Sequence, residues 1–203
     1  LSRLSVALYW AQPETRKRAL SDEAVAMARR LGYAPTIAYA LSSHIAALSG
    51  PDDVEKRLAA STEMMAIAEQ CDNREFAMIG RGWTIADALA LGDIHQARFA
   101  IAAFAALATK SRDPYFVWWL AAIRTMEAIL DGRLAEAEPL AQECLALGQR
   151  TNTIVATQVF AGQFFVLCLE GERYDRLEPI VRGLVDQFPS ILGGHCALAL
   201  LHA

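Results

Sequence analysis

The sequence has little glycine and proline, and this shortage argues against a fold made of many tight turns. Its 203 residues include only 12 Gly and 7 Pro, whereas Ala and Leu are by far its commonest residues. Ala and Leu are strong helix formers, and short strands need frequent turn residues. The chain is also 54% hydrophobic, so it can bury a core, which excludes a disordered protein. The composition therefore predicts an all-α globular fold.

The sequence has no excess of basic residues, which excludes a generally basic surface for nucleic acid. Lys and Arg number 19 against 23 Asp and Glu, a net charge of −4. The most basic segment, residues 14–30, holds five basic and three acidic residues, including the run Arg16-Lys17-Arg18. Charge runs of this kind are typical of a solvated helix face. We expect no direct contact with nucleic acid from this region.

Patterns for metal, cofactor or catalytic chemistry are also missing. There is no CxxC pair, no HExxH motif and no GxxxxGK[ST] phosphate loop. Asp87 and Glu127 each interrupt an apolar stretch, and we expect both on the solvated sides of their helices. We predict no enzyme activity, no cofactor and no bound metal. The thiols are expected to be free, in a reducing, cytoplasmic setting; they belong to Cys71, Cys144, Cys168 and Cys196.

No hydrophobic run is long and pure enough to predict a membrane span. The longest candidate, residues 151–169, lacks formal charges but contains six polar side chains of Thr, Asn and Gln. A spanning helix needs about 20 predominantly apolar residues. This segment is therefore predicted to be a buried helix, and the protein to have no membrane contact.

The chain is organised by an internal repeat of about 40 residues. Adding 40 and then 80 to the stripe Ile94, Ala97, Ile101 and Phe104 reaches apolar residues each time, with helical spacing. Glycines recur where helices should end, at Gly50, Gly92, Gly132 and Gly171. A second series of positions, also 40 residues apart, holds a small side chain or glycine each time. These positions are predicted to lie where two helices cross closely, and they are Ser42, Gly82, Ala122 and Gly162.

These periods predict a right-handed superhelical solenoid of antiparallel helix pairs with about 40 residues per repeat. First helices are expected at 14–31, 53–71, 93–110, 133–150 and 173–188, and second helices at 34–49, 74–91, 114–131 and 153–170. Residues 1–11 and 191–203 read as half-repeats. We interpret 1–203 as one domain, a fragment of a larger protein, which can self-associate weakly through end helices bearing Leu4, Leu8, Leu198 and Leu201.

The helix openings Gly92–Ala97 (GDIHQA) and Gly132–Ala137 (GRLAEA) resemble tetratricopeptide (TPR) repeats, although the period exceeds their usual length of about 34 residues. Arg18–Ala24, Trp118-Trp119, Asp131–Glu138 and Leu145–Arg150 are similar to the C-terminal helical region of large bacterial ATPase-containing regulators. These include MalT-like and LuxR-type transcription activators and ATPases fused to adenylate/guanylate cyclase domains. The resemblance implies a non-catalytic, TPR-like protein-interaction and regulatory module of a signalling or transcription-control protein, contacting a protein partner or other domains of its parent chain.

An aromatic and basic set supplies the candidate binding residues. It consists of Trp83, Trp118, Trp119 and Arg124. They could line a pocket between repeats for a small-molecule effector, which is the alternative function, or the aromatics could simply fill the core. Successive helical side chains point about 100° apart, so Trp118 and Trp119 are not expected to enter the same core. An enclosed pocket would favour sensing, and an open groove would favour a protein partner.

Overall fold

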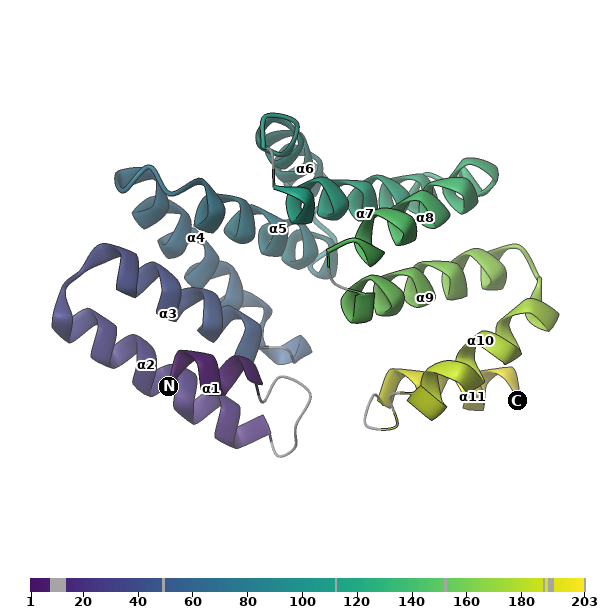
Figure 1. Ribbon diagram of the computed structural model, residues 1–203, viewed down its shortest axis with the longest axis horizontal. Helices are drawn as coiled ribbons and strands as arrows, with labels where there is room; N and C mark the ends of the chain where they lie inside the picture. Colours follow the sequence, from purple (N-terminus) through teal and green to yellow (C-terminus); the bar gives the residue numbers. More distant parts are fainter. Residues whose placement is uncertain are drawn as a thin grey trace. The chain divides into compact units, whose positions relative to one another are not determined.

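The computed structural model describes residues 1–7, 14–48, 50–111, 113–151, 153–187, 189 and 192–202, and most of these are helical (Figure 1). They form eleven α-helices, one short 3-10 helix and no strand, which confirms the all-α class. The elements are α1 (Ser2–Ala7), α2 (Glu14–Leu31), α3 (Ala34–Ala47), η1 (Pro51–Asp53), α4 (Val54–Gln70), α5 (Arg74–Ala90), α6 (Ile94–Ala108), α7 (Pro114–Leu130), α8 (Leu134–Gln149), α9 (Thr153–Glu170), α10 (Tyr174–Gln187) and α11 (Leu192–Leu201).

The helix bounds follow the period found in the sequence. Helices α2, α4, α6, α8 and α10 begin at positions 14, 54, 94, 134 and 174, and α3, α5 and α7 begin at 34, 74 and 114. The nine full helices predicted from the sequence lie within two residues of the observed bounds. In the half-repeat at 191–203, α11 (Leu192–Leu201) is helical, whereas residues 8–11 of the other half-repeat, with Leu8, lie outside the described residues.

The turns that lead from α5 to α6, from α7 to α8 and from α9 to α10 share one hydrogen-bond pattern. In each, an amide N–H donates to a carbonyl five residues back at 2.8 Å, which satisfies a carbonyl at the helix end. The pairs are Asp93 to Ala88, Arg133 to Ala128 and Arg173 to Cys168. Three turns spaced 40 residues apart therefore share this backbone hydrogen bond, which also closes the turn between α4 and α5, from Asn73 to Ala68.

The left-handed residue of this turn is not always glycine. Gly92 and Gly132 have φ of 74° and 73°, as their predicted helix-ending role requires. In the third turn the left-handed residue is Glu172, with φ of 53°, and Gly171 precedes it. Gly171 directly follows the end of α9, as predicted, but it is not the left-handed residue of this turn.

Residues 1–107 form a first compact unit. Within it α1 contacts α2 and α3, and successive helices from α2 to α5 pack on one another. Small and branched side chains fill the space between these helices, and Trp83 packs against them from outside. The buried residues of this core are Ala24, Val25, Ala28, Ala38, Ala40, Leu41, Ile45, Ala60 and Met64.

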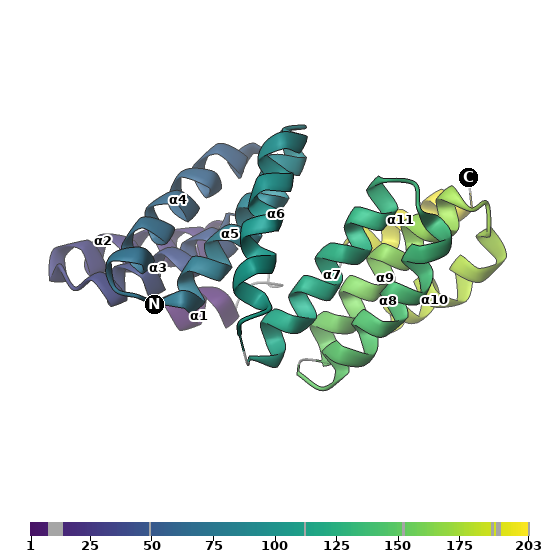
Figure 2. The same cartoon turned by 90° about the horizontal axis from the view of Figure 1, so that it is seen from above.

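Residues 108–203 form a second compact unit. Figure 2 shows α7, α8 and α9 side by side, and α9 to α11 continue the series of contacts. One buried cluster joins Trp118, Ala122, Cys144 and Ala156 from three helices. Near the chain end, Leu201 packs against the buried group formed by Phe164, Cys168 and Leu177. This apolar contact covers part of α11.

Close helix crossings occur, but the small-residue series marks them incompletely. Gly82 and Ala122 are buried, whereas Gly162 is exposed and a Cβ there would meet nothing within 4 Å, so its predicted crossing is wrong. A close crossing in the second unit lies at Gly148 instead. A Cβ at this position would clash with Ala156 Cβ and with Trp118 Nε1. The bulk of Trp118 accounts for the need for glycine there.

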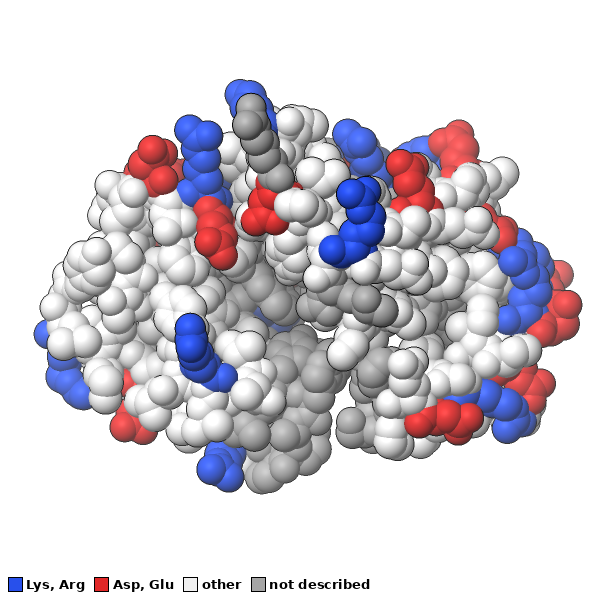
Figure 3. Space-filling model, viewed as in Figure 1, with Lys and Arg blue, Asp and Glu red and all other residues white. Residues whose placement is uncertain are grey.

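Surface properties agree with the modest net charge. On the face shown in Figure 3, acidic and basic side chains are interspersed. Within the described ranges, no helix combines the length and the hydropathy needed to cross a membrane. The predicted solvated face of residues 14–30 needs one correction, because Lys17 is only 2% exposed.

Candidate functional site

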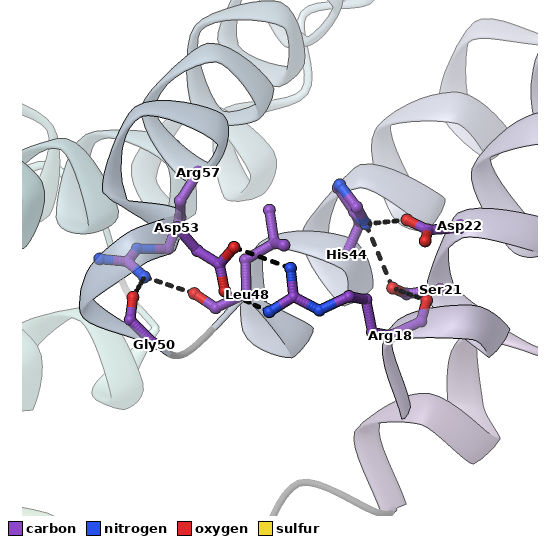
Figure 4. A network of polar contacts seen from close by, with 8 residues as sticks. All are labelled: Arg18, Ser21, Asp22, His44, Leu48, Gly50, Asp53 and Arg57. Atoms are coloured by element: carbon purple, nitrogen blue, oxygen red, sulfur yellow. Dashed lines mark hydrogen bonds and ion pairs between the residues drawn. The ribbon is translucent and has the colours of Figure 1, made fainter. Parts of the chain in front are cut away.

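A polar network of the first unit surrounds the connection between α3 and α4 (Figure 4). Arg18 of α2 donates two hydrogen bonds to the carboxylate of Asp53, one of them 2.7 Å long between Nη1 and Oδ1. The Asp53 side chain is almost fully buried. Its bond to the Arg18 guanidinium holds the pKa of Asp53 below the ordinary value of 3.8. The pair attaches the start of α4 to α2.

Arg57, one turn into α4, holds the same connection from the other side. Its Nε donates to Asp87 Oδ1 of α5 at 2.7 Å, and its Nη1 donates to the backbone carbonyls of Leu48 and Gly50. The Trp83 ring centroid lies 5.6 Å from the Arg57 guanidinium carbon, within cation–π range. One buried arginine therefore joins the α3–α4 connection to α5.

Asp87 is fully buried, which corrects the expectation that it faces solvent. Burial raises the pKa of its carboxyl above 3.8, and the Arg57 guanidinium opposes this shift. The second carboxylate oxygen, Oδ2, has no hydrogen-bond partner among the described residues. The ion pair replaces apolar packing: the residues 40, 80 and 120 positions after Arg57 are Ala97, Ala137 and Leu177, all fully buried.

A serine, a histidine and an aspartate meet on α2 and α3, but not in the arrangement of a catalytic triad. Ser21 donates to the carbonyl of Arg18 at 2.8 Å, so the Nδ1–H of His44 donates to Ser21 Oγ at 3.1 Å. Asp22 Oδ1 lies 3.3 Å from the same nitrogen. A triad needs serine and carboxylate on opposite ring nitrogens, and Ser21 is fully buried. Burial also lowers the pKa of His44 below 6.5.

An open groove of about 370 Å³ lies between α2, α3 and α4, and we call it the α2–α4 groove. Its floor is apolar and includes Val25 and Leu41, while its rim carries five ionisable side chains. The full lining is Asp22, Val25, Ala26, Arg29, Leu41, His44, Lys56, Ala59, Ala60 and Glu63.

A second open groove, of about 320 Å³, lies between α8, α9 and α10, and we call it the α8–α10 groove. Six of its ten lining residues lie 120 positions, or three repeats, after residues that line the α2–α4 groove. The pairs are Val25 and Leu145, Arg29 and Gln149, Leu41 and Ala161, Ala59 and Pro179, Ala60 and Ile180, and Glu63 and Gly183. The same face of the repeat is therefore hollowed in both units. The lining of the second groove contains no charged residue.

The four residues proposed from the sequence lie in neither groove. Trp83, in the first unit, is half-buried against the core beside Arg57. In the second unit Trp118 is 3% exposed, and the half-buried Trp119 packs against the buried cluster that contains Trp118, contrary to the expectation that they do not enter the same core. The Trp119 ring also stacks on the Phe116 ring, with the ring centroids 6.5 Å apart and an angle of 13° between the ring planes. Arg124 is exposed on α7 and does not join them.

Sequence reasoning missed the residues that do assemble. Arg57 could have been noticed in the sequence, because it is a charged residue at a position where the following repeats have apolar residues. The groove residues had no such feature beyond their place in the repeat. Among the described residues, no group of three or more His, Cys, Asp or Glu side chains is placed to hold a metal ion.

Comparison of the chain with protein-family models, with curated proteins and with solved structures gives no match.

Proposed function

We propose that the chain is a non-catalytic protein-interaction module, with a regulatory role in a larger protein, as its resemblance to bacterial regulators implies. The observation that supports this most is the pair of equivalent grooves. Repeated helices that expose the same face can bind a partner segment through surface complementarity. The openness of both grooves favours a protein segment over an enclosed small molecule.

The proposal includes the finer architecture. The evenly spaced helix starts and the repeated turn support antiparallel helix pairs in a right-handed, TPR-like solenoid. A crystal structure would test it through the rotation relating successive pairs. A left-handed or irregular rotation would contradict the solenoid while leaving the helices unchanged.

The small-molecule alternative depends on a pocket at Trp83, Trp118, Trp119 and Arg124. The described structure gives it less support, because Trp118 occupies the space beside Gly148 with its own ring. Neither open groove includes any of the four residues.

Selection from a random-peptide phage library on the immobilised protein tests the interaction function. We expect enrichment of a consensus sequence, and we expect synthetic consensus peptides to bind saturably. Ala60→Trp and Ile180→Trp, which fill one groove each, should weaken binding of the peptides that use that groove. Ile154→Trp, at an exposed α9 position outside both grooves, is the matched control. Failure to enrich any consensus, or equal binding by groove-filled and control proteins, would contradict the proposal.

A further inference from the structure

The charges around the α2–α4 groove are arranged in two groups. Arg29 of α2 and Glu63 of α4 form an ion pair with a 2.7 Å contact, so they neutralise each other across one end. Asp22 and Lys56 each precede a member of that pair by seven residues on the same helix. Seven residues of α-helix span about 10 Å. A second pair of opposite charges therefore belongs to the other end of the groove.

Asp22 and Lys56 are not joined by an ion pair in the described structure. The Asp22 side chain is 59% exposed, and its neighbour His44 is neutral near pH 7 because burial lowers the His44 pKa. Lys56 is exposed, and the carboxylate that it influences, Asp53, is already bound by Arg18. An exposed carboxylate that contacts the His44 imidazole and an exposed ammonium group thus stand at the groove, on α2 and α4.

Besides the half-buried His44 imidazole next to Asp22, the groove lining near these charges consists of small or medium apolar side chains, namely Val25, Leu41, Ala59 and Ala60. A bound segment gains free energy by burying an aliphatic side chain on such a floor. The segment gains further electrostatic attraction when one flanking residue is basic and lies near Asp22 and the other is acidic and lies near Lys56.

Resting on the proposed interaction function, we propose that the α2–α4 groove binds a protein segment of mixed charge. This segment carries a basic and an acidic side chain on either side of an aliphatic anchor. The α8–α10 groove, with an uncharged lining, provides an internal contrast, because peptides that bind there should show no such charge pattern.

Charge-reversing variants test the inference through the same selection. Asp22→Lys places two cations at the groove and should enrich peptides with two acidic residues, whereas Lys56→Glu should enrich peptides with two basic residues. Peptides selected on the unmodified protein should bind each variant more weakly by about two- to fivefold per lost ion pair. Glu23→Lys and Arg30→Glu are matched controls: both residues are exposed on α2, make the same charge changes and lie outside the groove.

The outcomes separate the two proposals. If no peptide is enriched on any form, the interaction function itself fails. If peptides are enriched and Ala60→Trp abolishes their binding, but the charge reversals change selection no more than the controls do, the groove binds a partner and the mixed-charge inference is wrong. If millimolar free leucine, used as a zwitterionic probe, shifts the NMR signals of Asp22 and Lys56 and displaces the peptides, the site is one for small molecules, which would also overturn it.

Discussion

Arg57 and Asp87 show how one pair of residues can change the character of a repeat. Removing the Asp87 carboxylate would leave the Arg57 guanidinium buried without an opposite charge, because both side chains are at most 8% exposed. Breaking a buried pair from one side commonly costs about 3–5 kcal/mol. We expect Asp87→Ala to lower the free energy of unfolding by about this amount, measured by urea denaturation.

The double variant Arg57→Met with Asp87→Leu is the control for this prediction. It restores the apolar character that the later repeats have at the Arg57 position, as at Leu177, and that one later repeat has at the Asp87 position, at Leu167. Replacing both charges is often neutral or stabilising, so the double variant should be more stable than Asp87→Ala. If both variants lost the same free energy of unfolding, the destabilisation would come from altered packing and not from the unpaired charge.

One of the turns between helices places a residue with a side chain in a backbone conformation that favours glycine. Glu172 adopts the left-handed conformation that Gly92 and Gly132 adopt in the equivalent turns. A residue with a Cβ is disfavoured in this conformation by roughly 1–2 kcal/mol. Glycine avoids this cost, but it loses more conformational freedom on folding, which cancels part of the gain.

We therefore expect Glu172→Gly to raise the unfolding free energy by about 0.5–1 kcal/mol. Urea denaturation followed by circular dichroism would measure it. Gly132→Ala is the reciprocal control and should be destabilising. A loss of stability in Glu172→Gly would show that the glutamate side chain contributes more than its conformation costs.

The helices could be predicted from the sequence because their determinants are local and repeated. Apolar stripes and helix-ending glycines recur once per repeat, and the bounds of α2 to α10 follow them. Asp87 was assigned to solvent because its partner, Arg57, is distant in the sequence and only packing brings the two together. Trp118 and Trp119 pack on the same cluster because α8 and α9 both contribute residues that contact α7 there. Pairings and grooves of this kind depend on how helices face one another, which periodicity alone does not specify.

At the scale of the whole molecule, the shifted pKa values act together on stability. Burial lowers the pKa of His44 below 6.5, so the unfolded chain binds this proton more readily and folding weakens as the pH falls through 6.5. Asp53 and Glu138, whose pKa values are lowered mainly by bonds to Arg18 and Arg173, stabilise the fold fully above their ordinary values of 3.8 and 4.5. Their contributions are lost at lower pH. Asp87 acts in the opposite direction, because its raised pKa favours proton uptake by the folded chain.

Stability should therefore fall in two stages on acidification, the first below pH 6.5 from His44 and the second below about pH 4.5 from the two carboxylates. Urea midpoints measured across this range would resolve the stages. His44→Asn retains a hydrogen-bonding side chain but cannot titrate, so it should remove the first stage and leave the second. His195→Asn, at an exposed histidine of α11, is the matched control and should preserve both. If His44→Asn kept the full decline between pH 6.5 and about pH 5, the imidazole buried between α2 and α3 would not be its source, and protonation would have to act through another group.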